Sequence, residues 1–212
     1  MTVDVPARVD VPVRGLLPVG IPLGWDRRPG QAGYAVRRSG QLFMLSPLQY
    51  EIWRIAHACP PREQISSAVA NADASAWDGP AVATGCTELL EAGLLLEMTG
   101  EAARDWLPAR ELRPIPRAIP REYSEAGAVF ELPASQTGVY VDVLSYLVWS
   151  LWDGTRSVRS AADTVVDETG YSPAVIRDVS LGLLAGGTRM PLLFLDRIPA
   201  EPADGTSRKG TI

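Results

Sequence analysis

The feature that most constrains the fold of this chain is a segment that occurs twice. Residues 48–58 read LQYEIWRIAHA and residues 144–154 read LSYLVWSLWDG, so Leu, Tyr and Trp return in the same order 96 residues later. Apolar residues in this register recur at steps of three and four, the spacing of one face of a helix. Further along, the best spacing becomes 93 residues, where Pro80 matches Pro173 and Gly93 matches Gly186. The sequence therefore predicts an internal duplication, with the same fold formed twice.

Each copy predicts a hairpin, three helices and a closing strand. In the first copy, apolar runs in residues 34–45 surround Ser39-Gly40, which is a hairpin signal. A helix follows, with Ser46 as N-cap and Pro47 at the first helical position. The remaining elements are expected at residues 62–72, Asp78–Ala92 with Gly93 as C-cap, and 94–98. Their counterparts in the second copy are residues 128–142, a helix capped by Asp142, residues 157–170, a helix from Ser172 to Gly186-Gly187, and residues 191–196.

These elements predict an α+β chain of two tandem winged helix-turn-helix domains, each a small antiparallel hairpin plus three helices. The expected divisions are an extended N-terminal segment (1–33), the first domain (34–98), a Pro-rich linker (99–127), the second domain (128–198) and a disordered tail (199–212). Four prolines and equal numbers of basic and acidic residues in 99–127 are typical of an extended connector. The segment GIPLGW (20–25) could add an edge strand to the first domain.

Charge, cysteine content and the length of apolar runs indicate which partners and which cellular compartment to expect. The net charge is −5, from 20 basic and 25 acidic residues, whereas nucleic-acid binders usually carry a basic surplus. Only two cysteines, Cys59 and Cys86, are present, which favours a reducing compartment over a disulfide framework. The chain has no apolar run of about 18 residues, and its start lacks the layout of a signal peptide. We expect a cytoplasmic protein that does not enter a membrane.

Several short sequence segments together resemble those of the PqqD-like family. The residues LSP lead into the first helix, which carries Tyr50 and then Trp53. The corresponding helix of the second copy ends in WDGT. A short amphipathic helix follows, and the third helix leads into LLEAGLLLE. PqqD-like domains are the recognition elements of pathways that make ribosomally synthesised, post-translationally modified peptides. The resemblance covers about 70 residues in each copy, although one chain holding two copies is unlike the usual single domain.

The resemblance implies a site for a leader peptide, bound as an added strand between the last hairpin strand and the third helix. In this chain those parts are residues 41–44 and 80–92, or 138–141 and 173–185 in the second copy. The residues that the resemblance implies for peptide binding are Arg37, Arg38, Gln41, Phe43, Met44, Val82, Cys86 and Leu89. With Arg27 and Arg28, the two hairpin arginines are expected to form a basic cluster for an acidic leader. The alternative is that these arginines only solvate the hairpin.

The main rival is a winged-helix DNA-binding transcriptional regulator. In such proteins the third helix enters the major groove, and basic residues hold the phosphates. Here the third helix of the first copy carries Asp78, Glu88 and Glu91 but no basic residue, and that of the second copy has Arg177 beside Asp178. Nucleic acid is therefore the less favoured partner.

Enzymatic chemistry has little support in the sequence. His57 is the sole histidine and, with Cys59 and Cys86, makes three potential metal ligands without an obvious fourth. No Gly-rich phosphate loop is present. We expect a non-catalytic peptide-recognition or scaffold protein with no cofactor and no metal. Its expected partners are a precursor peptide and a peptide-modifying enzyme, and a homodimer is left open.

Overall fold

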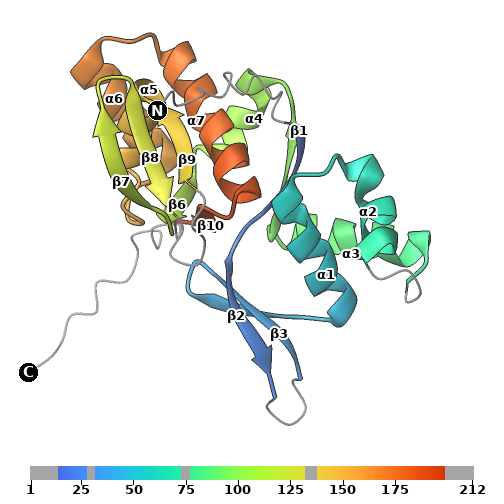
Figure 1. Ribbon diagram of the computed structural model, residues 1–212. Helices are drawn as coiled ribbons and strands as arrows, with labels where there is room; N and C mark the ends of the chain where they lie inside the picture. Colours follow the sequence, from blue (N-terminus) through green and yellow to red (C-terminus); the bar gives the residue numbers. More distant parts are fainter. Residues whose placement is uncertain (1–13, 28–31, 73–76, 132–137, 199–212) are drawn as a thin grey trace, which may run out of the picture.

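The computed structural model describes residues 14–27, 32–72, 77–131 and 138–198, and one element order occurs twice in them (Figure 1). The described chain is mixed α/β, with seven α-helices and several small antiparallel sheets. The first unit, residues 14–99, consists of β1 (Arg14–Pro18), β2 (Ile21–Asp26), β3 (Gly33–Arg38), β4 (Gln41–Leu45), α1 (Pro47–Ile55), α2 (Ile65–Ala72), α3 (Gly79–Glu91) and β5 (Leu95–Thr99). Two 3-10 turns, η1 (Ala56–Ala58) and η2 (Arg62–Gln64), separate α1 from α2.

The second unit, residues 112–197, repeats this order after a connecting helix, α4 (Ala102–Ala109). Its elements are β6 (Leu112–Pro116), β7 (Ile119–Ser124), β8 (Gly127–Glu131), β9 (Gly138–Asp142), α5 (Val143–Ser150), α6 (Val158–Thr169), α7 (Pro173–Arg189) and β10 (Leu193–Arg197). In each unit the first and last strands pair, β1 with β5 and β6 with β10. The three central strands form a separate antiparallel sheet, β2-β3-β4 or β7-β8-β9.

Local signals in the sequence explain where the helices begin. Ser46 accepts from the backbone of Gln49 in a capping box, and Asp142 accepts from the backbone of Leu144 and Ser145, which confirms the two predicted caps. The third helices begin after the N-caps Asp78 and Ser172. These caps are 94 residues apart, so the predicted spacing of 93 is one residue short. The difference arises because the proline occupies the second position of α3 and the first position of α7.

The segments expected to be extended contain regular structure. Residues 99–127 hold α4, β6 and β7, and the N-terminal segment holds β1 as well as the predicted edge strand, seen as β2. Proline misled the prediction because it is tolerated at the edges of sheets, where its missing N–H costs no ladder hydrogen bond. The strands also extend the repeat, since Pro18, Ile21 and Pro22 recur 98 residues later as Pro116, Ile119 and Pro120. The expected tail lies outside the described residues.

The two-stranded ribbon β1-β5 joins the two units because both of its faces are buried. Leu16 and Leu95 belong to the core of the first unit, whereas Leu17, Leu96 and Met98 belong to a second core that continues through α5, α6 and α7. This alternation follows from the two-residue period of a strand. Figure 1 shows α7 between the sheet of the second unit and the first unit. The described chain is therefore held together by a ribbon shared between two cores.

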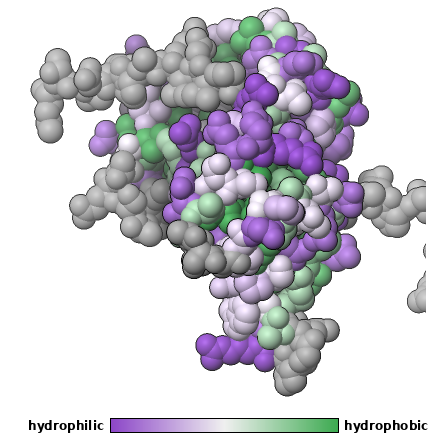
Figure 2. All heavy atoms as spheres, turned by 90° about the vertical axis from the view of Figure 1, so that its right-hand side faces the viewer, coloured by the Kyte–Doolittle hydropathy of each residue, from purple (hydrophilic) through white to green (hydrophobic). Residues whose placement is uncertain are grey.

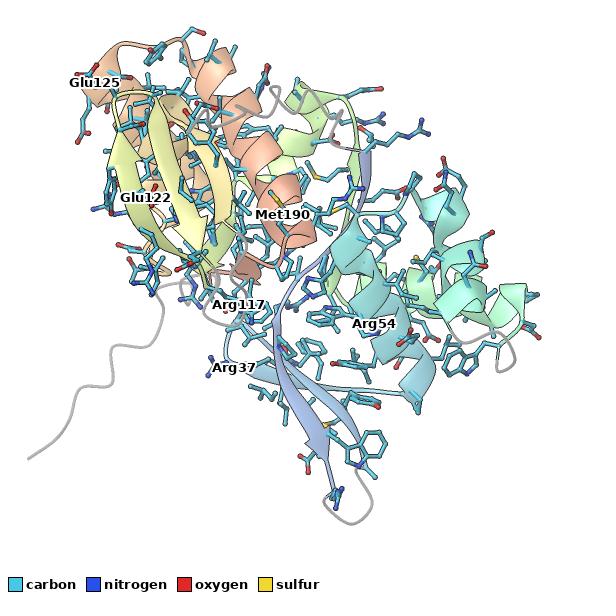
Figure 3. All side chains as sticks on the ribbon, in the orientation of Figure 1. Arg37, Arg54, Arg117, Glu122, Glu125 and Met190 are labelled. Atoms are coloured by element: carbon cyan, nitrogen blue, oxygen red, sulfur yellow. The ribbon has the colours of Figure 1, made fainter. Side chains whose placement is uncertain are left out.

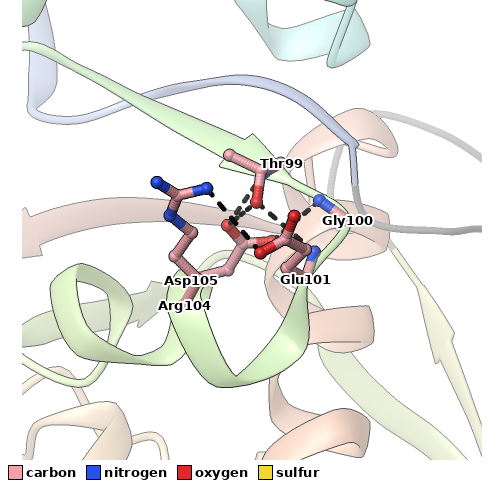
Figure 4. Close-up of polar contacts among 5 residues, drawn as sticks. All are labelled: Thr99, Gly100, Glu101, Arg104 and Asp105. Carbon is pink, nitrogen blue, oxygen red and sulfur yellow. Dashed lines mark hydrogen bonds and ion pairs between the residues drawn. The ribbon is translucent and has the colours of Figure 1, made fainter.

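A buried carboxylate fixes the turn that leads from the ribbon into α4 (Figure 4). Asp105 is 2% exposed and accepts three hydrogen bonds, from the Thr99 N–H at 2.8 Å, the Thr99 hydroxyl at 2.9 Å and the Gly100 N–H at 2.9 Å. Two of these donors are backbone groups next to the start of a helix, where a negative charge is favourable. The second unit therefore begins from a turn with a defined direction.

We expect Asp105→Asn to lower the free energy of unfolding by about 1–3 kcal/mol, because the amide cannot accept from both sides. Equilibrium denaturation in urea measures the change. Asp163→Asn is the matched control, since Asp163 forms an exposed pair with Arg159 at 3.5 Å and its loss should cost less than about 1 kcal/mol. Equal effects of the two substitutions would contradict the role given to the turn.

Candidate functional site

The outer edge of β4, here called the β4 edge, is the backbone of Gln41–Leu45 that faces away from β3. The two strands join through Ser39-Gly40 and pair Arg38 with Gln41 in a regular register. In a two-residue hairpin the flanking pair is hydrogen bonded, and inward and outward groups then alternate. The N–H and C=O groups of Leu42 and Met44 therefore point outward, and in the described residues they have no backbone partner.

The other edge of each three-stranded sheet is unsuited to pairing. Pro22 in β2 and Pro120 in β7 each stand beside a shift in register. Proline and irregular register are devices that protect a sheet edge from further strands. The strands β4 and β9 contain neither. Each sheet thus has one blunted edge and one regular edge.

Side chains from β3 and α1, the elements before and after β4, contact α3 at two places. Near the hairpin turn, the Arg38 guanidinium donates to the Ala92 carbonyl at the end of α3 and lies 4.8 Å from the centre of the Phe43 ring. At the start of α1, the Gln49 amide donates to the Glu88 carboxylate at 2.8 Å. The region between these two contacts, beside β4 and α3, is here called the strip between β4 and α3.

Arg38 belongs to a charge cluster at the contact between the units. Asp196 on β10 is 2% exposed and accepts from the Ser39 N–H at 2.7 Å and from Arg113 at 2.6 Å. The Ser39 hydroxyl donates to the Arg197 carbonyl at 2.8 Å. Burial lowers the pKa of Arg38, and so does the neighbouring Arg197, while Asp196 acts in the opposite direction. The second unit therefore holds the hairpin turn from which β4 begins.

Seven of the eight residues predicted for peptide binding fall into two groups. Arg38, Gln41, Phe43 and Met44 lie together on the hairpin. Val82, Cys86 and Leu89 are at most 1% exposed and pack in the core of the first unit, so the structure removes them from a surface site. These three residues were predicted to bind the peptide because they lie on the third helix. They occupy the face of that helix that packs against the core.

The predicted basic cluster does not form as a unit. Arg37 is exposed on β3, and Figure 3 shows it pointing away from the helices. Arg27 follows the end of β2 that pairs with Gly33, whereas Arg37 pairs with Ile21 at the other end. At the rise of a strand these positions are roughly 20 Å apart. Arg28 lies outside the described residues.

The corresponding strip of the second unit is built differently. Ser145, in the place of Gln49, bonds to Asp142 at 2.9 Å, and Gly182 stands where the first unit has Glu88. A side chain at Gly182 would meet nothing within 4 Å, and Val175 nearby on α7 is 43% exposed. This strip therefore lacks the polar tie found between α1 and α3.

His57 and Cys59 lie at the contact between the units, where both residues are partly buried. Burial is the main cause that lowers the pKa of His57, and the cations Arg117 and Arg54 act in the same direction. Burial raises the pKa of Cys59 to about 11, so the thiol stays protonated near neutral pH. The Cys59 thiol lies 3.5 Å from the Ala185 carbonyl of α7. Cys59 thus packs against α7 of the second unit.

The exposed face of α3 is acidic or neutral. A hollow of about 420 Å³ along it is lined by Ala83, Thr84, Thr87, Glu88 and Glu91. On α7, Arg177 is paired with Asp178 at 2.9 Å. Figure 2 shows the face of the molecule on the side of α1–α3, where hydrophilic residues are interspersed with small apolar areas.

Comparisons with protein-family models, with curated proteins and with solved structures give no match. Within the described residues, His, Cys, Asp and Glu side chains do not gather in groups of three that could hold a metal ion. The described helices are all too short or too polar to cross a membrane. The residues that sequence reasoning missed are Asp196, Arg113, Gln49 and Glu88, whose contacts join positions between 39 and 157 residues apart.

We expect Asp196→Asn to lower the free energy of unfolding by about 2–4 kcal/mol. This is less than the full cost of breaking a buried ion pair, because Arg113 is 27% exposed. Amide hydrogen exchange at Ser39 should become faster, which reports the loosened hairpin. Glu131→Gln, which breaks the exposed pair with Arg121, should change stability by less than about 1 kcal/mol. Unchanged exchange at Ser39 would contradict the anchoring role.

Stability should also fall in mild acid because of His57. Its pKa is lowered in the folded state, so the unfolded chain binds the proton more readily, and stability is lost as pH falls below about 6.5. Because His57 is the only histidine, His57→Gln should flatten the slope of unfolding free energy between pH 7.5 and 5.5. Urea denaturation across this range measures the slope, and equal slopes would contradict the assignment.

Proposed function

We propose that this chain is a peptide-recognition protein made of two winged-helix units, in which an extended segment of a precursor peptide adds as a strand to the β4 edge. The observation that carries the proposal is the regular edge of β4, whose outward groups have no backbone partner in the described residues. An edge of this kind is a template for strand addition.

The β4 edge offers hydrogen bonds and side-chain contacts at the same place. Leu42 and Met44 each present one outward donor and one outward acceptor, and Leu42 is 44% exposed. Phe43 and Arg38 lie on the side of the tie to α3. A peptide would form its backbone hydrogen bonds with Leu42 and Met44. Its selectivity would come from side-chain contacts along the strip between β4 and α3.

The nature of the peptide follows from the resemblance to the PqqD-like family. On that basis the bound segment is the leader of a ribosomally made peptide, and the chain serves the enzyme that modifies it without doing chemistry itself. The protonated Cys59 and the partly buried His57 support a role other than catalysis. Arg38 supplies a positive charge near one end of the β4 edge, which suits an acidic leader.

DNA regulation has weaker physical support. Each phosphate contact needs a neutralising cation, but the exposed face of α3 carries Glu88 and Glu91, and Arg177 of α7 is already paired with Asp178. A duplex placed along α3 would meet acidic or neutral charge, and on α7 the one further cation is Arg189 in the last turn. Strand addition needs no such charge.

A selection experiment tests the proposal without knowledge of the natural peptide. The full chain is immobilised and panned against a display library of random linear dodecapeptides, and enriched peptides are titrated by amide NMR. We expect saturable binding that shifts the Leu42 and Met44 amides most. A random 20-base-pair duplex in about 150 mM salt should not bind saturably. Tight, steeply salt-dependent duplex binding without peptide enrichment would overturn the proposal.

Met44→Pro is the sharpest variant, because it removes an outward N–H and leaves the ladder to β3 intact. Binding of the selected peptides should weaken about tenfold or more, the equivalent of one hydrogen bond and a local clash. Tyr140→Pro at the equivalent position of β9 is the matched control, and circular dichroism checks that both variants fold. If only Tyr140→Pro weakens binding, the peptide binds to the second unit; if neither variant does, strand addition is wrong.

A further inference from the structure

One hollow in the described chain is lined by the face of α1 that is turned away from Gly85 of α3. It has a volume of about 590 Å³, and we call it the aromatic pocket. Its main lining residues are Tyr34, Pro47, Tyr50, Glu51, Arg54 and Trp77. The four that come from α1 are spaced by three or four residues and share one face of the helix. Gly85 of α3 faces Leu48, Gln49 and Ile52 of α1, so the pocket and the strip beside β4 are separate places.

Aromatic rings form the walls of this pocket. The Tyr34 and Tyr50 rings stack with their centres 3.9 Å apart and 5° between their planes. Trp25, which is 46% exposed, meets Tyr34 edge to face at 4.7 Å. Trp77 closes the pocket from the residue before the N-cap of α3. Flat apolar groups bind well between such walls.

The charged side chains of the pocket offer a ligand hydrogen-bond donors, because the carboxylate acceptors are already occupied. Both oxygens of Glu51 are occupied by Arg54, at 2.9 Å from Nε and 2.5 Å from a terminal nitrogen. The hydrogen bond from Arg54 lowers the pKa of Glu51, which keeps the carboxylate charged and the pair intact. Arg54 is 53% exposed and has five N–H groups, so three remain for a ligand. Figure 3 shows Arg54 on the exposed side of α1.

The residues at the equivalent positions of the second unit indicate which features of the pocket are needed for packing alone. Three of its equivalent positions are aromatic, Tyr123 for Trp25, Tyr146 for Tyr50 and Tyr171 for Trp77, whereas Ala128 stands in the place of Tyr34. Tyr146 packs against Tyr123 in edge-to-face contact at 5.4 Å. Leu147 and Ser150 stand in the places of Glu51 and Arg54. The fold therefore tolerates the loss of the charged pair, which makes a ligand the better explanation for its presence in the first unit.

We propose that the aromatic pocket binds an aromatic ring carried next to a carboxylate. The ring lies against Tyr50 and Trp77, and the carboxylate accepts from the free N–H groups of Arg54. An anion is favoured over a cation because Glu51, the only carboxylate among the described residues that line the pocket, is already paired, whereas Arg54 has N–H groups that Glu51 does not use. This ligand can be a small aromatic acid or an aromatic residue beside an acidic one in a peptide. The proposal does not depend on strand addition at β4.

Two pairs of probes test the proposal and separate the two sources. N-acetyl-phenylalanine is compared with its amide, and a blocked peptide Gly-Phe-Glu-Gly with its Gln counterpart. Titrations follow the indole N–H signal of Trp77 by NMR, assigned with Trp77→Leu. We expect saturable binding of one or both carboxylate probes, about tenfold tighter than the matching amide. Binding of the free acid alone indicates a small molecule, and binding of the peptide indicates a segment of a partner.

Arg54→Gln should remove the preference for the carboxylate and weaken binding about tenfold. Arg159→Gln is the matched control, because Arg159 is an exposed helical arginine paired with Asp163 in the second unit, and it should leave binding unchanged. Circular dichroism and thermal melts check that both variants fold. The proposal is overturned if no probe binds, or if acid and amide bind equally and Arg54→Gln has no effect.

Discussion

Burial of both faces of the β1-β5 ribbon is the constraint on which the rest of the chain depends. A two-stranded ribbon is marginal alone in water, but here Leu16 and Leu95 fill one core while Leu17, Leu96 and Met98 fill the other. Fully burying each such side chain is worth about 1.5–3 kcal/mol. Backbone hydrogen bonds tie the same segment to its surroundings, from Leu16 to Pro60 and from Gly20 to Leu195. The ribbon therefore couples the stability of one unit to that of the other.

This coupling decides how the β4 edge is presented. Because the units share a core, β10 of the second unit reaches the hairpin of the first, where Asp196 accepts from Ser39. The hairpin is thus held at its turn by the other unit and at its base by α1. An edge strand that is fixed at both ends loses less conformational entropy when a partner strand is added, which favours binding. A single unit could not supply the contact at the turn.

The sequence was informative where structure depends on neighbours in the chain. Ser46 and Asp142 were predicted as caps, and both accept the expected backbone hydrogen bonds. The sequence did not indicate which face of α3 is buried. Val82 and Cys86 lie on the buried face because the core that they join is assembled from distant segments. Proline composition hid β6 and β7, since edge strands accept proline. Asp196 could not have been found at all, as it meets Ser39 across 157 residues.

The two copies agree in architecture and differ at equivalent surface positions, and that contrast separates structural from functional demands. Positions that pack inward keep their character, as Trp53 and Trp149 do at 2% and 5% exposure. Positions that face outward differ: Leu147 and Ser150 stand in the places of Glu51 and Arg54, and Gly182 stands in the place of Glu88. A duplicated fold needs only one copy of each binding surface, so the other is free to change. The polar features kept in the first unit alone are thus the ones that folding does not explain.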